Sequence, residues 1–386
     1  MLRRITSFIA HALAILALVI LFAWVAGRIA TDRWLLTQFL FWIPAYAALP
    51  AAAALAIVAS LPRVRRPAPD SESPRRRRSR IALLSLCGLI AALGHVLVFE
   101  WRLPWGSSEG GVAASAPQQT LRVLHWNMST VDWSYYPDSL DLPPAGERPV
   151  DLACITRMLE AKRLDDVIAS VASAGHPPFI AQHGLFVFIS RYPIIRSGSA
   201  MLALADGEST VGTPPEWAQK RFNQLARFLK LPERSFDLAE QGSIIFAEID
   251  ATPVVGRPVI VWFIDFPSNP MLHRRAVASI AARRLGLLRE NGWLPKSPNP
   301  AIPGPDILLG DTNIPRGSGS LSLLAPGMTH AFNQAGMGAA ATWPRAYPVF
   351  HVDHIFLAPP FRAASYRILD RGVSDHRLQL ADIGLR

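Results

Sequence analysis

The chain has little cysteine and, over its first 101 residues, no lysine. Cys87 and Cys154 are the two cysteines among 386 residues, and Cys87 lies within an apolar run. A structural disulfide between them is therefore not expected, which excludes the class of small folds held together by disulfides. Two unpaired cysteines leave the redox compartment of the protein open.

Positive charge is concentrated at one end of the chain. Residues 1–101 contain twelve arginines and four carboxylates, so they carry +8 of the net charge of +10, and the remainder carries +2. Binding to duplex nucleic acid depends on many contacts with phosphates. A nearly neutral remainder therefore argues against a partner such as long DNA.

Three apolar stretches occupy residues 5–26, 34–61 and 81–99. Each is long enough to cross a bilayer, which takes about 20 residues. The first follows the basic start MLRR, but its run exceeds the roughly 7–15 residues of a signal-peptide core, so we predict a retained anchor. Pro44 and Pro50 interrupt the second stretch and predict a kink or an early end there.

The arginines predict how these spans are oriented. The segment 63–80, RVRRPAPDSESPRRRRSR, contains eight arginines, whereas the loop between the first two spans has two arginines and one aspartate. The positive-inside rule places the N-terminus and this loop in the cytoplasm. We therefore predict a membrane domain over residues 1–103 with three transmembrane helices. Three crossings place the rest of the chain on the opposite side, which for a bacterial inner-membrane protein is the periplasm.

The composition changes after the third span. Residues 104–120 are mostly small and polar and are predicted to be a linker. From residue 121 to 386, short β-rich runs such as LRVLHW, GLFVFIS, PVIVWFI and VDHIFLA alternate with helical patterns at 159–174, 216–231 and 273–290. This alternation predicts one α/β domain. Strands that are apolar on both faces indicate a sheet covered by helices on one side and by a second sheet on the other.

Several of these strands end in polar residues that could bind a phosphate and a metal. LRVLHWN ends in Asn127, and ILLGDTN contains Asp311 and Asn313 at the end of a predicted strand. HVDHIF contains Asp353 at the start of another predicted strand. SDH near the C-terminus supplies Asp375 and His376. Each motif alone is typical of a turn. Their repetition against successive strands favours a shared site.

With these motifs in the order LRVLHWN, SRYPI, GDTN, TWP, VDHIF and SDH, residues 121–386 resemble the endonuclease/exonuclease/phosphatase superfamily, which has the DNase I-like fold. The resemblance implies a four-layered α/β sandwich and a hydrolase that cleaves phosphate esters with Mg²⁺ or Mn²⁺. It implies catalytic roles for four residues: Asp311, Asn313, Asp353 and His376. Asn127 and Asp375 are the implied metal ligands.

The residue types suit this chemistry. Cleavage of a phosphate ester requires neutralisation of anionic oxygens, an oriented nucleophile and protonation of the leaving oxygen. Asp311 could orient or deprotonate water, and Asn313 could donate to the phosphate. His376 could contact the phosphate or exchange its proton, while Asp353 holds the imidazole in one tautomer.

Two positions depart from the pattern of the superfamily. The strand DLACIT is followed by Arg157 where relatives keep a metal-binding Glu, and Glu160 could substitute for it. Asp265 stands where relatives have a His. Arg157 could contact the substrate phosphate directly, because a guanidinium is a bidentate phosphate ligand. Asp265 could contact the substrate or bind a metal.

Two functions therefore remain open from the sequence. One is a membrane-anchored, periplasm-facing phosphodiesterase or phosphatase. The other is a catalytically impaired protein that binds a phosphorylated ligand or a partner protein. The sequence identifies neither the substrate, which could be nucleic acid, nucleotide, phosphoinositide or sphingolipid, nor the oligomeric state.

Overall fold

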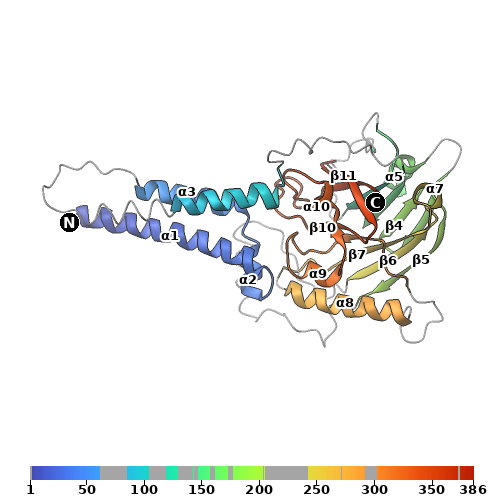
Figure 1. Cartoon of the computed structure of the whole chain (residues 1–386), viewed down its shortest axis with the longest axis horizontal. Coiled ribbons are helices and arrows are strands. Elements are labelled where there is room, and N and C mark those ends of the chain that lie inside the picture. The colour runs from blue at the N-terminus through green and yellow to red at the C-terminus, as the bar shows by residue number, and fades with distance from the viewer. Residues whose placement is uncertain are drawn as a thin grey trace. The chain divides into compact units, whose positions relative to one another are not determined.

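The computed structural model describes residues 2–60, 85–103, 119–128, 142, 147–156, 161–172, 177–202, 204, 242–270, 272–291, 302–372 and 374–386. The chain forms two compact units, Met1–Gly106 and Ser107–Arg386. The first is helical, and the second contains two β-sheets with helices (Figure 1). The predicted linker at 104–120 lies outside the described residues except for its last two.

The helical unit contains fewer long apolar helices than the three spans predicted. Within α1 (Leu2–Ala30), the segment Ala12–Ala30 is the one described helix long and apolar enough to cross a membrane. The second predicted span is a pair of helices, α2 (Leu35–Phe41) and α3 (Ala45–Ser60), bent by 77°. In the region of the third, the described helix Ser85–Glu100 is shorter than a full span. The described residues therefore contain one candidate span, or two if the bent pair is counted as one, rather than the three predicted, and the kink predicted at Pro44 is present.

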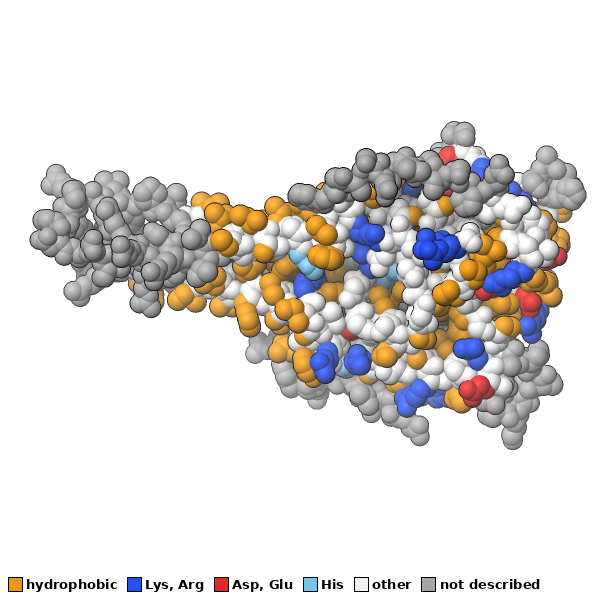
Figure 2. All heavy atoms as spheres, viewed as in Figure 1, with side chains coloured by type: hydrophobic (Ala, Val, Ile, Leu, Met, Phe, Trp, Pro, Cys, Tyr) orange, Lys and Arg blue, Asp and Glu red, His pale blue; other side chains and the backbone are white. Residues whose placement is uncertain are grey.

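Arg28 explains how the break between α2 and α3 is tolerated. Its guanidinium donates to the carbonyl oxygens of Phe41 and Ile43, at the break, and pairs with Glu100 at 2.8 Å. A helix that breaks leaves carbonyl groups without intrahelical partners, and these groups need other donors. Arg28 supplies them, and it joins the end of α1 to the end of the helix Ser85–Glu100. Hydrophobic side chains cover the described helices of this unit, whereas charged side chains are scattered over the other unit (Figure 2).

The second unit is built on two six-stranded sheets. The first sheet has the order β11-β12-β1-β2-β4-β3, and the second has the order β5-β6-β7-β8-β10-β9. The strands of the first sheet are β1 (Leu121–Asn127), β2 (Leu152–Thr156), β3 (Phe179–His183), β4 (Phe186–Ser190), β11 (Phe361–Leu369) and β12 (Leu378–Leu385). Those of the second are β5 (Ile194–Met201), β6 (Ser243–Ile249), β7 (Val259–Asp265), β8 (Ile307–Asp311), β9 (Thr329–His330) and β10 (Asp353–Leu357).

The sheets pack face to face through apolar side chains. Val123 and Cys154 of the first sheet and Val261, Phe263 and Leu309 of the second are fully buried in the core between them. Side chains alternate between the two faces of a strand, so the intervening residues face outward and need a second cover. Two helices, α5 and α8, provide it.

Helix α5 (Ala161–Val171) covers the outer face of the first sheet, where Val167 and Val171 pack among the strand residues Leu124, Ile155 and Val187. Helix α8 (Arg274–Asn291) covers the second sheet in the same way, through the core that contains Ala281, Leu285 and Trp262. Short helices α7 (Thr252–Val255), α9 (Leu321–Leu324) and α10 (Ala331–Ala335) lie in the connections. The order helix, sheet, sheet, helix is the predicted four-layered α/β sandwich.

Candidate active site

The predicted site residues meet because of how the strands are directed. β1 and β2 are parallel, as are β7 and β8, so their carboxyl ends reach the same edge of each sheet. The antiparallel neighbour β10 begins at that edge, with Asp353 opposite Asp311. Asp265, the last residue of β7, is the register partner of Asp311 on its other side. Asn127 ends β1.

Four predicted residues form a continuous polar cluster. His376 Nδ1 lies 2.9 Å from Asp353 Oδ2, and His376 Nε2 lies 3.7 Å from Asp311 Oδ2. Asn127 Nδ2 donates to the same Asp311 oxygen at 2.8 Å. All four side chains are buried. One imidazole thus lies between two carboxylates, with an amide on the far side of the second.

Glycine is required immediately before Asp311. Gly310 has a φ of 139°, and a Cβ at this position would lie 1.8 Å from the carbonyl oxygen of Ile264 on β7. No side chain fits between the two strands at that distance, and the backbone oxygen cannot move without breaking the sheet. The GD pair in GDTN therefore reflects close packing of β8 on β7 as well as chemistry.

The turn after Asp311 is fixed by its own side chains. Asn313 has a left-handed φ of 51°, and its N–H donates to Asp311 Oδ1 at 2.8 Å. Asn313 Nδ2 donates to the carbonyl of Phe266 at 2.9 Å. Since an amide has two hydrogens on its nitrogen, this bond leaves one donor of Asn313 for another acceptor.

Asp375 lies at the margin of the cluster. Its Oδ1 is 3.9 Å from His376 Nε2, and its Oδ2 accepts a long hydrogen bond of 3.4 Å from Trp343 Nε1. The side chain is 26% exposed, in contrast to the buried Asp311 and Asp353. Asp375 can therefore meet both solvent and the imidazole.

The charges in the cluster reinforce one another. Burial opposes the charged form of His376, but Asp353, Asp311 and Asp375 outweigh it and raise its pKa to about 9. Burial raises the pKa of Asp311, and the carboxylates of Asp353 and Asp265 raise it further. Burial also acts to raise the pKa of Asp353, but His376 outweighs it and lowers that pKa. At neutral pH the imidazole is therefore cationic and Asp353 is ionised.

Side chains that were not predicted to act in the site hold the backbone of Asp353, Asn127 and His376 in place. The Thr342 hydroxyl accepts the N–H of Asp353 at 3.3 Å, and the Gln379 amide donates to its carbonyl oxygen. The Ser374 hydroxyl donates to the Asn127 carbonyl at 2.6 Å and accepts the N–H of His376 at 3.0 Å. A signal for Gln379 was present in the sequence, since it is polar and fully buried within the apolar strand LQLADI.

The oxygen donors of this cluster suit a hard divalent cation. Asp265, Asp311 and Asp375 offer carboxylate oxygens and Asn127 an amide oxygen, which are ligand types that Mg²⁺ and Mn²⁺ prefer. Asp265, Asp311, Asp353 and Asp375 also outnumber the single imidazolium among the described residues of the cluster, so a cation would relieve negative charge. Arg157 and Glu160, predicted to bind substrate and metal, lie outside the described residues.

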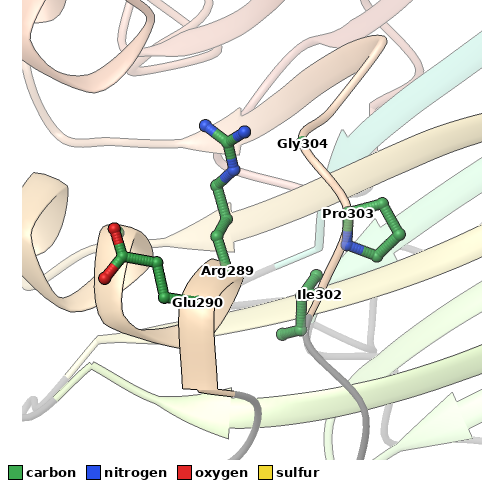
Figure 3. A pocket seen from close by; sticks show the side chains of 6 residues that line it. Arg289, Glu290, Ile302, Pro303 and Gly304 are labelled. Carbon is green, nitrogen blue, oxygen red and sulfur yellow. The ribbon is translucent and has the colours of Figure 1, made fainter.

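A separate hollow of about 360 Å³ lies between the end of α8 and residues 302–304 (Figure 3). Arg289 and Glu290 of α8 line it together with Ile302, Pro303 and Gly304. None of the predicted site residues contributes to its wall. We therefore identify the candidate site by the polar cluster rather than by this hollow.

No family model and no curated protein matches the sequence. Among solved structures, an endonuclease/exonuclease/phosphatase family protein from Bacteroides thetaiotaomicron is 14% identical, with 68% of this chain and 97% of that chain covered and a TM-score of 0.42. The mannosyl-6-phosphatase Bt3783 of the same organism has 14% identity, 68% and 99% coverage and a TM-score of 0.42. D. rerio TDP2, complexed with a single-stranded DNA product, has 14% identity, 68% and 98% coverage and a TM-score of 0.38.

Proposed function

We propose that the chain is a membrane-anchored hydrolase of phosphate esters. The observation that supports this most directly is a row of four buried side chains. Asp353 contacts His376, His376 lies beside Asp311, and Asn127 donates to Asp311. An imidazolium beside two carboxylates and amide donors provides what phosphoester cleavage needs: a cationic donor, an acceptor for a water proton and hydrogen-bond donors for the phosphate.

His376 is the proposed donor. Asp353 accepts from Nδ1 and so fixes the ring orientation, which leaves Nε2–H directed to the side of Asp311 and Asp375. With its pKa near 9, the ring carries the proton at neutral pH and can donate it to a phosphate or leaving oxygen.

Asp311 is the proposed acceptor for the attacking water in its ionised form, which a bound cation would favour, because burial and the neighbouring carboxylates raise its pKa to about 8. Its Oδ1 already accepts the Asn313 N–H, and its Oδ2 accepts from Asn127, so the carboxylate is held in one orientation. Asn313 retains one amide hydrogen for the phosphate. Asp265 lies beside Asp311 and is proposed to contact the substrate or its counter-ion.

A divalent cation, when bound, would neutralise phosphate charge. Asn127 and Asp375 are the proposed ligands among the described residues, with Glu160 as a further candidate. The proposed substrates are phosphate esters as a class.

The direct test is hydrolysis of bis-p-nitrophenyl phosphate and p-nitrophenyl phosphate by the full-length protein in detergent, with Mg²⁺, Mn²⁺ or EDTA. Asp311→Ala and His376→Ala should each lose most of the rate while remaining folded. Asp306→Asn and His183→Ala are matched controls, because Asp306 precedes the opposite end of β8 and His183 is on β3. Equal rates in the wild type and both site variants would reject the assignment.

The alternative is a phosphate-binding protein without turnover, and Arg157 is the reason to retain it. If Arg157 neutralises the phosphate, binding of inorganic phosphate should persist in EDTA, and Arg157→Glu should weaken it and create a Mg²⁺ requirement. If Glu160 supplies a metal ligand instead, Glu160→Gln should abolish Mg²⁺ binding while Arg157→Glu has little effect. Calorimetric titration of Mg²⁺ into the wild type and both variants separates these outcomes.

We also propose that the chain is multi-pass and that the domain at 121–386 faces the periplasm. The arginine distribution supports this orientation. The contacts of Arg28 with Phe41 and Glu100 are compatible with this orientation, because they bring together the C-terminal ends of α1, of α2 and of the helix Ser85–Glu100.

A further inference from the structure

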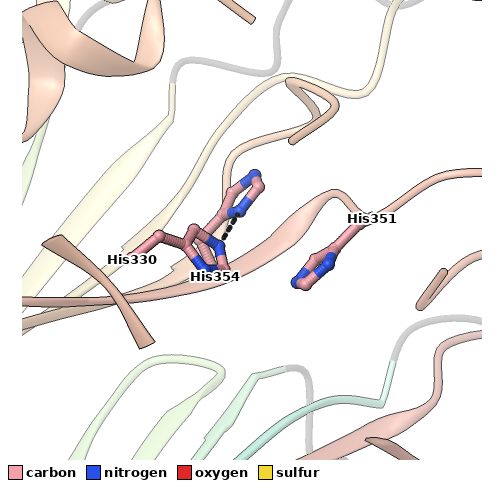
Figure 4. A group of neighbouring side chains, drawn as sticks. All are labelled: His330, His351 and His354. Atoms are coloured by element: carbon pink, nitrogen blue, oxygen red, sulfur yellow. Dashed lines mark hydrogen bonds between the residues drawn. The ribbon is translucent and has the colours of Figure 1, made fainter. Parts of the chain in front are cut away.

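Three buried histidines lie together near the candidate site, and one of them, His354, follows Asp353 directly on β10 (Figure 4). They are His330, His351 and His354, and their ring nitrogens can be chosen to lie within 4.8 Å of one another. Such a group is a natural candidate for a zinc site. The hydrogen bonds of two of the rings point to a different role.

The proton positions on His330 and His354 follow from their partners. The backbone N–H of Phe332 donates to His330 Nδ1 at 3.1 Å, so that nitrogen has no proton. Burial lowers the pKa of both rings, which are therefore neutral, and His330 must carry its proton on Nε2. His330 Nε2 lies 2.9 Å from His354 Nδ1 and donates to it, and His354 Nε2 donates to the carbonyl oxygen of Ile314 at 2.7 Å.

This arrangement uses every ring nitrogen of His330 and His354. A metal ligand needs a free lone pair on the coordinating nitrogen. Binding a metal through His330 Nε2 would break the bond between the two rings and would move the single proton of His330 to Nδ1, where it would face the N–H of Phe332. His351 belongs to neither of the hydrogen bonds His330–His354 and His354–Ile314, since its Nε2 contacts the Tyr366 hydroxyl at 3.3 Å.

We propose that His354, oriented by His330, is a positioning residue that sets the backbone of the turn Asp311–Ile314 and thereby places Asn313 beside Asp311. The catalytic consequence rests on the function proposed above. His354 follows Asp353 on β10, so the two side chains point to opposite faces of the strand. On β10, Asp353 therefore orients the imidazole of His376, and the next residue, His354, binds the turn at Ile314.

Asn313 is in the left-handed region, which asparagine tolerates better than most residues but which is not its only accessible conformation, so contacts on either side of it select this conformation. Before Asn313, the N–H of Thr312 donates to the Val352 carbonyl at 3.1 Å. After it, the bond from His354 to Ile314 is the shortest described contact of the turn with β10. Without that bond the turn can relax toward a right-handed conformation and carry the Asn313 amide away.

The variants follow from these bonds. His354→Leu removes the donor to Ile314, whereas His354→Gln retains an amide N–H at a similar reach. His330→Asn keeps an oxygen that can accept the Phe332 N–H as a helix cap, but it removes the donor to His354. His351→Leu is the matched control, because it makes the same kind of change in the same cluster outside the two bonds.

In the hydrolysis assay, His354→Leu should lower kcat by about 10- to 100-fold with KM changed by less than about twofold, as expected when a reacting group is misplaced. His354→Gln should recover most of the rate, and His330→Asn should fall between them. In an Asn313→Ala background, His354→Leu should cost little more, because both changes remove the same contact. Additive losses, or an equal loss in His351→Leu, would overturn the proposal.

Hydrogen–deuterium exchange of the full-length variants tests the positioning without any need for turnover. The amides of residues 312–316 should lose protection in His354→Leu, and retain it in His354→Gln and His351→Leu. Uniform protection across all variants would overturn the proposal, even if the wild type is an active hydrolase. Stoichiometric Zn²⁺ binding to the wild type that is lost in His354→Gln would overturn it as well. A wild type without hydrolase activity would reject the proposed function while the exchange result still decides the role of His354.

Discussion

Replacing Asp311 with Asn should stabilise the protein while it removes activity. Asp311 is fully buried, and Asp353 and Asp265 lie on either side of it in the sheet. These surroundings raise the pKa of Asp311 from 3.8 to about 8, so the fold disfavours the ionised carboxylate. The asparagine side chain has nearly the same shape and no charge to bury. It loses one of the two hydrogen bonds that Asp311 accepts, from Asn127 Nδ2 and the Asn313 N–H, because an NH2 group cannot accept it.

The magnitude follows from the pKa. One pKa unit corresponds to about 1.4 kcal/mol, so the fold disfavours the ionised carboxylate by at most ~6 kcal/mol. The destabilisation is absent below the unfolded pKa, grows as pH rises from about 4 to about 8, and is constant above that. Asp311 also supports the charge of His376, and this support is lost in the variant. We therefore expect a net gain of ~2 kcal/mol at pH 8, which shifts Tm upward by roughly 5 °C for a domain of this size.

The assay is thermal unfolding of the full-length protein in detergent and EDTA, followed by near-UV circular dichroism from pH 5 to pH 9. Asp306→Asn is the control, because Asp306 precedes the other end of β8 and pairs with Arg257 at 2.6 Å. It should not be more stable than the wild type. Millimolar Mg²⁺ should raise the Tm of the wild type more than that of Asp311→Asn, since a cation compensates the charge that the variant lacks. An Asp311→Asn protein no more stable than the wild type at pH 8 would refute the reasoning.

Three further outcomes are expected. Gly310→Ala should destabilise the domain by several kcal/mol, measured by urea unfolding, because its Cβ would meet the Ile264 carbonyl oxygen at 1.8 Å; a change within about 0.5 kcal/mol would mean that β7 and β8 can separate at this point. Burial acts to raise the pKa of Asp382, but its bonds to Arg122 and other donors outweigh this and lower that pKa. The stability that Asp382 contributes is therefore present above about pH 4 and is lost as pH falls further. In a plot of unfolding free energy against pH, Asp382→Asn should flatten the fall at acid pH, and an unchanged fall would show that other groups cause it. Alkaline phosphatase fused after Arg386 should be active in a bacterium, and activity of a cytoplasmic reporter at the same position instead would reverse the proposed topology.

The convergence of the site could be predicted because it depends on strand direction and on the packing of the two sheets. Asn127 and Asp311 end their strands and Asp353 begins the antiparallel strand beside Asp311, so strand direction brings Asp311 and Asp353 to one edge, and the packing of the two sheets brings Asn127 to it. The four layers followed from the same patterns, since strands that are apolar on both faces need a cover on each. The roles of these residues remain predictions.

The contacts that hold the site in place could not be predicted. His330 and His354 are joined by a hydrogen bond between residues 24 positions apart, and each stands in a short run that reads as apolar strand or turn. Thr342 and Gln379 bind the backbone of Asp353, and neither the TWP motif that contains Thr342 nor the strand that contains Gln379 predicts that partner. Hydropathy over a window predicted three spans because it reports composition alone. The break between α2 and α3 was predicted from Pro44, but the contact of Arg28 with the carbonyl groups at that break was not.

The balance of charge determines whether the departure at Arg157 abolishes metal chemistry. A guanidinium about 4 Å from a divalent cation costs roughly 8 kcal/mol at an effective dielectric of 20. A carboxylate at the same distance gains as much, and Asp311 and Asp375 both lie within 4 Å of His376 Nε2. Thr156, the residue before Arg157, is the register partner of Asn127, so the arginine follows the strand that reaches this carboxylate-rich edge. An arginine beside several carboxylates is therefore compatible with a bound cation, and it can also take the place of one. An arginine at this position in the sequence therefore does not by itself exclude a bound cation, and the deciding quantity is the affinity for Mg²⁺ with and without the guanidinium.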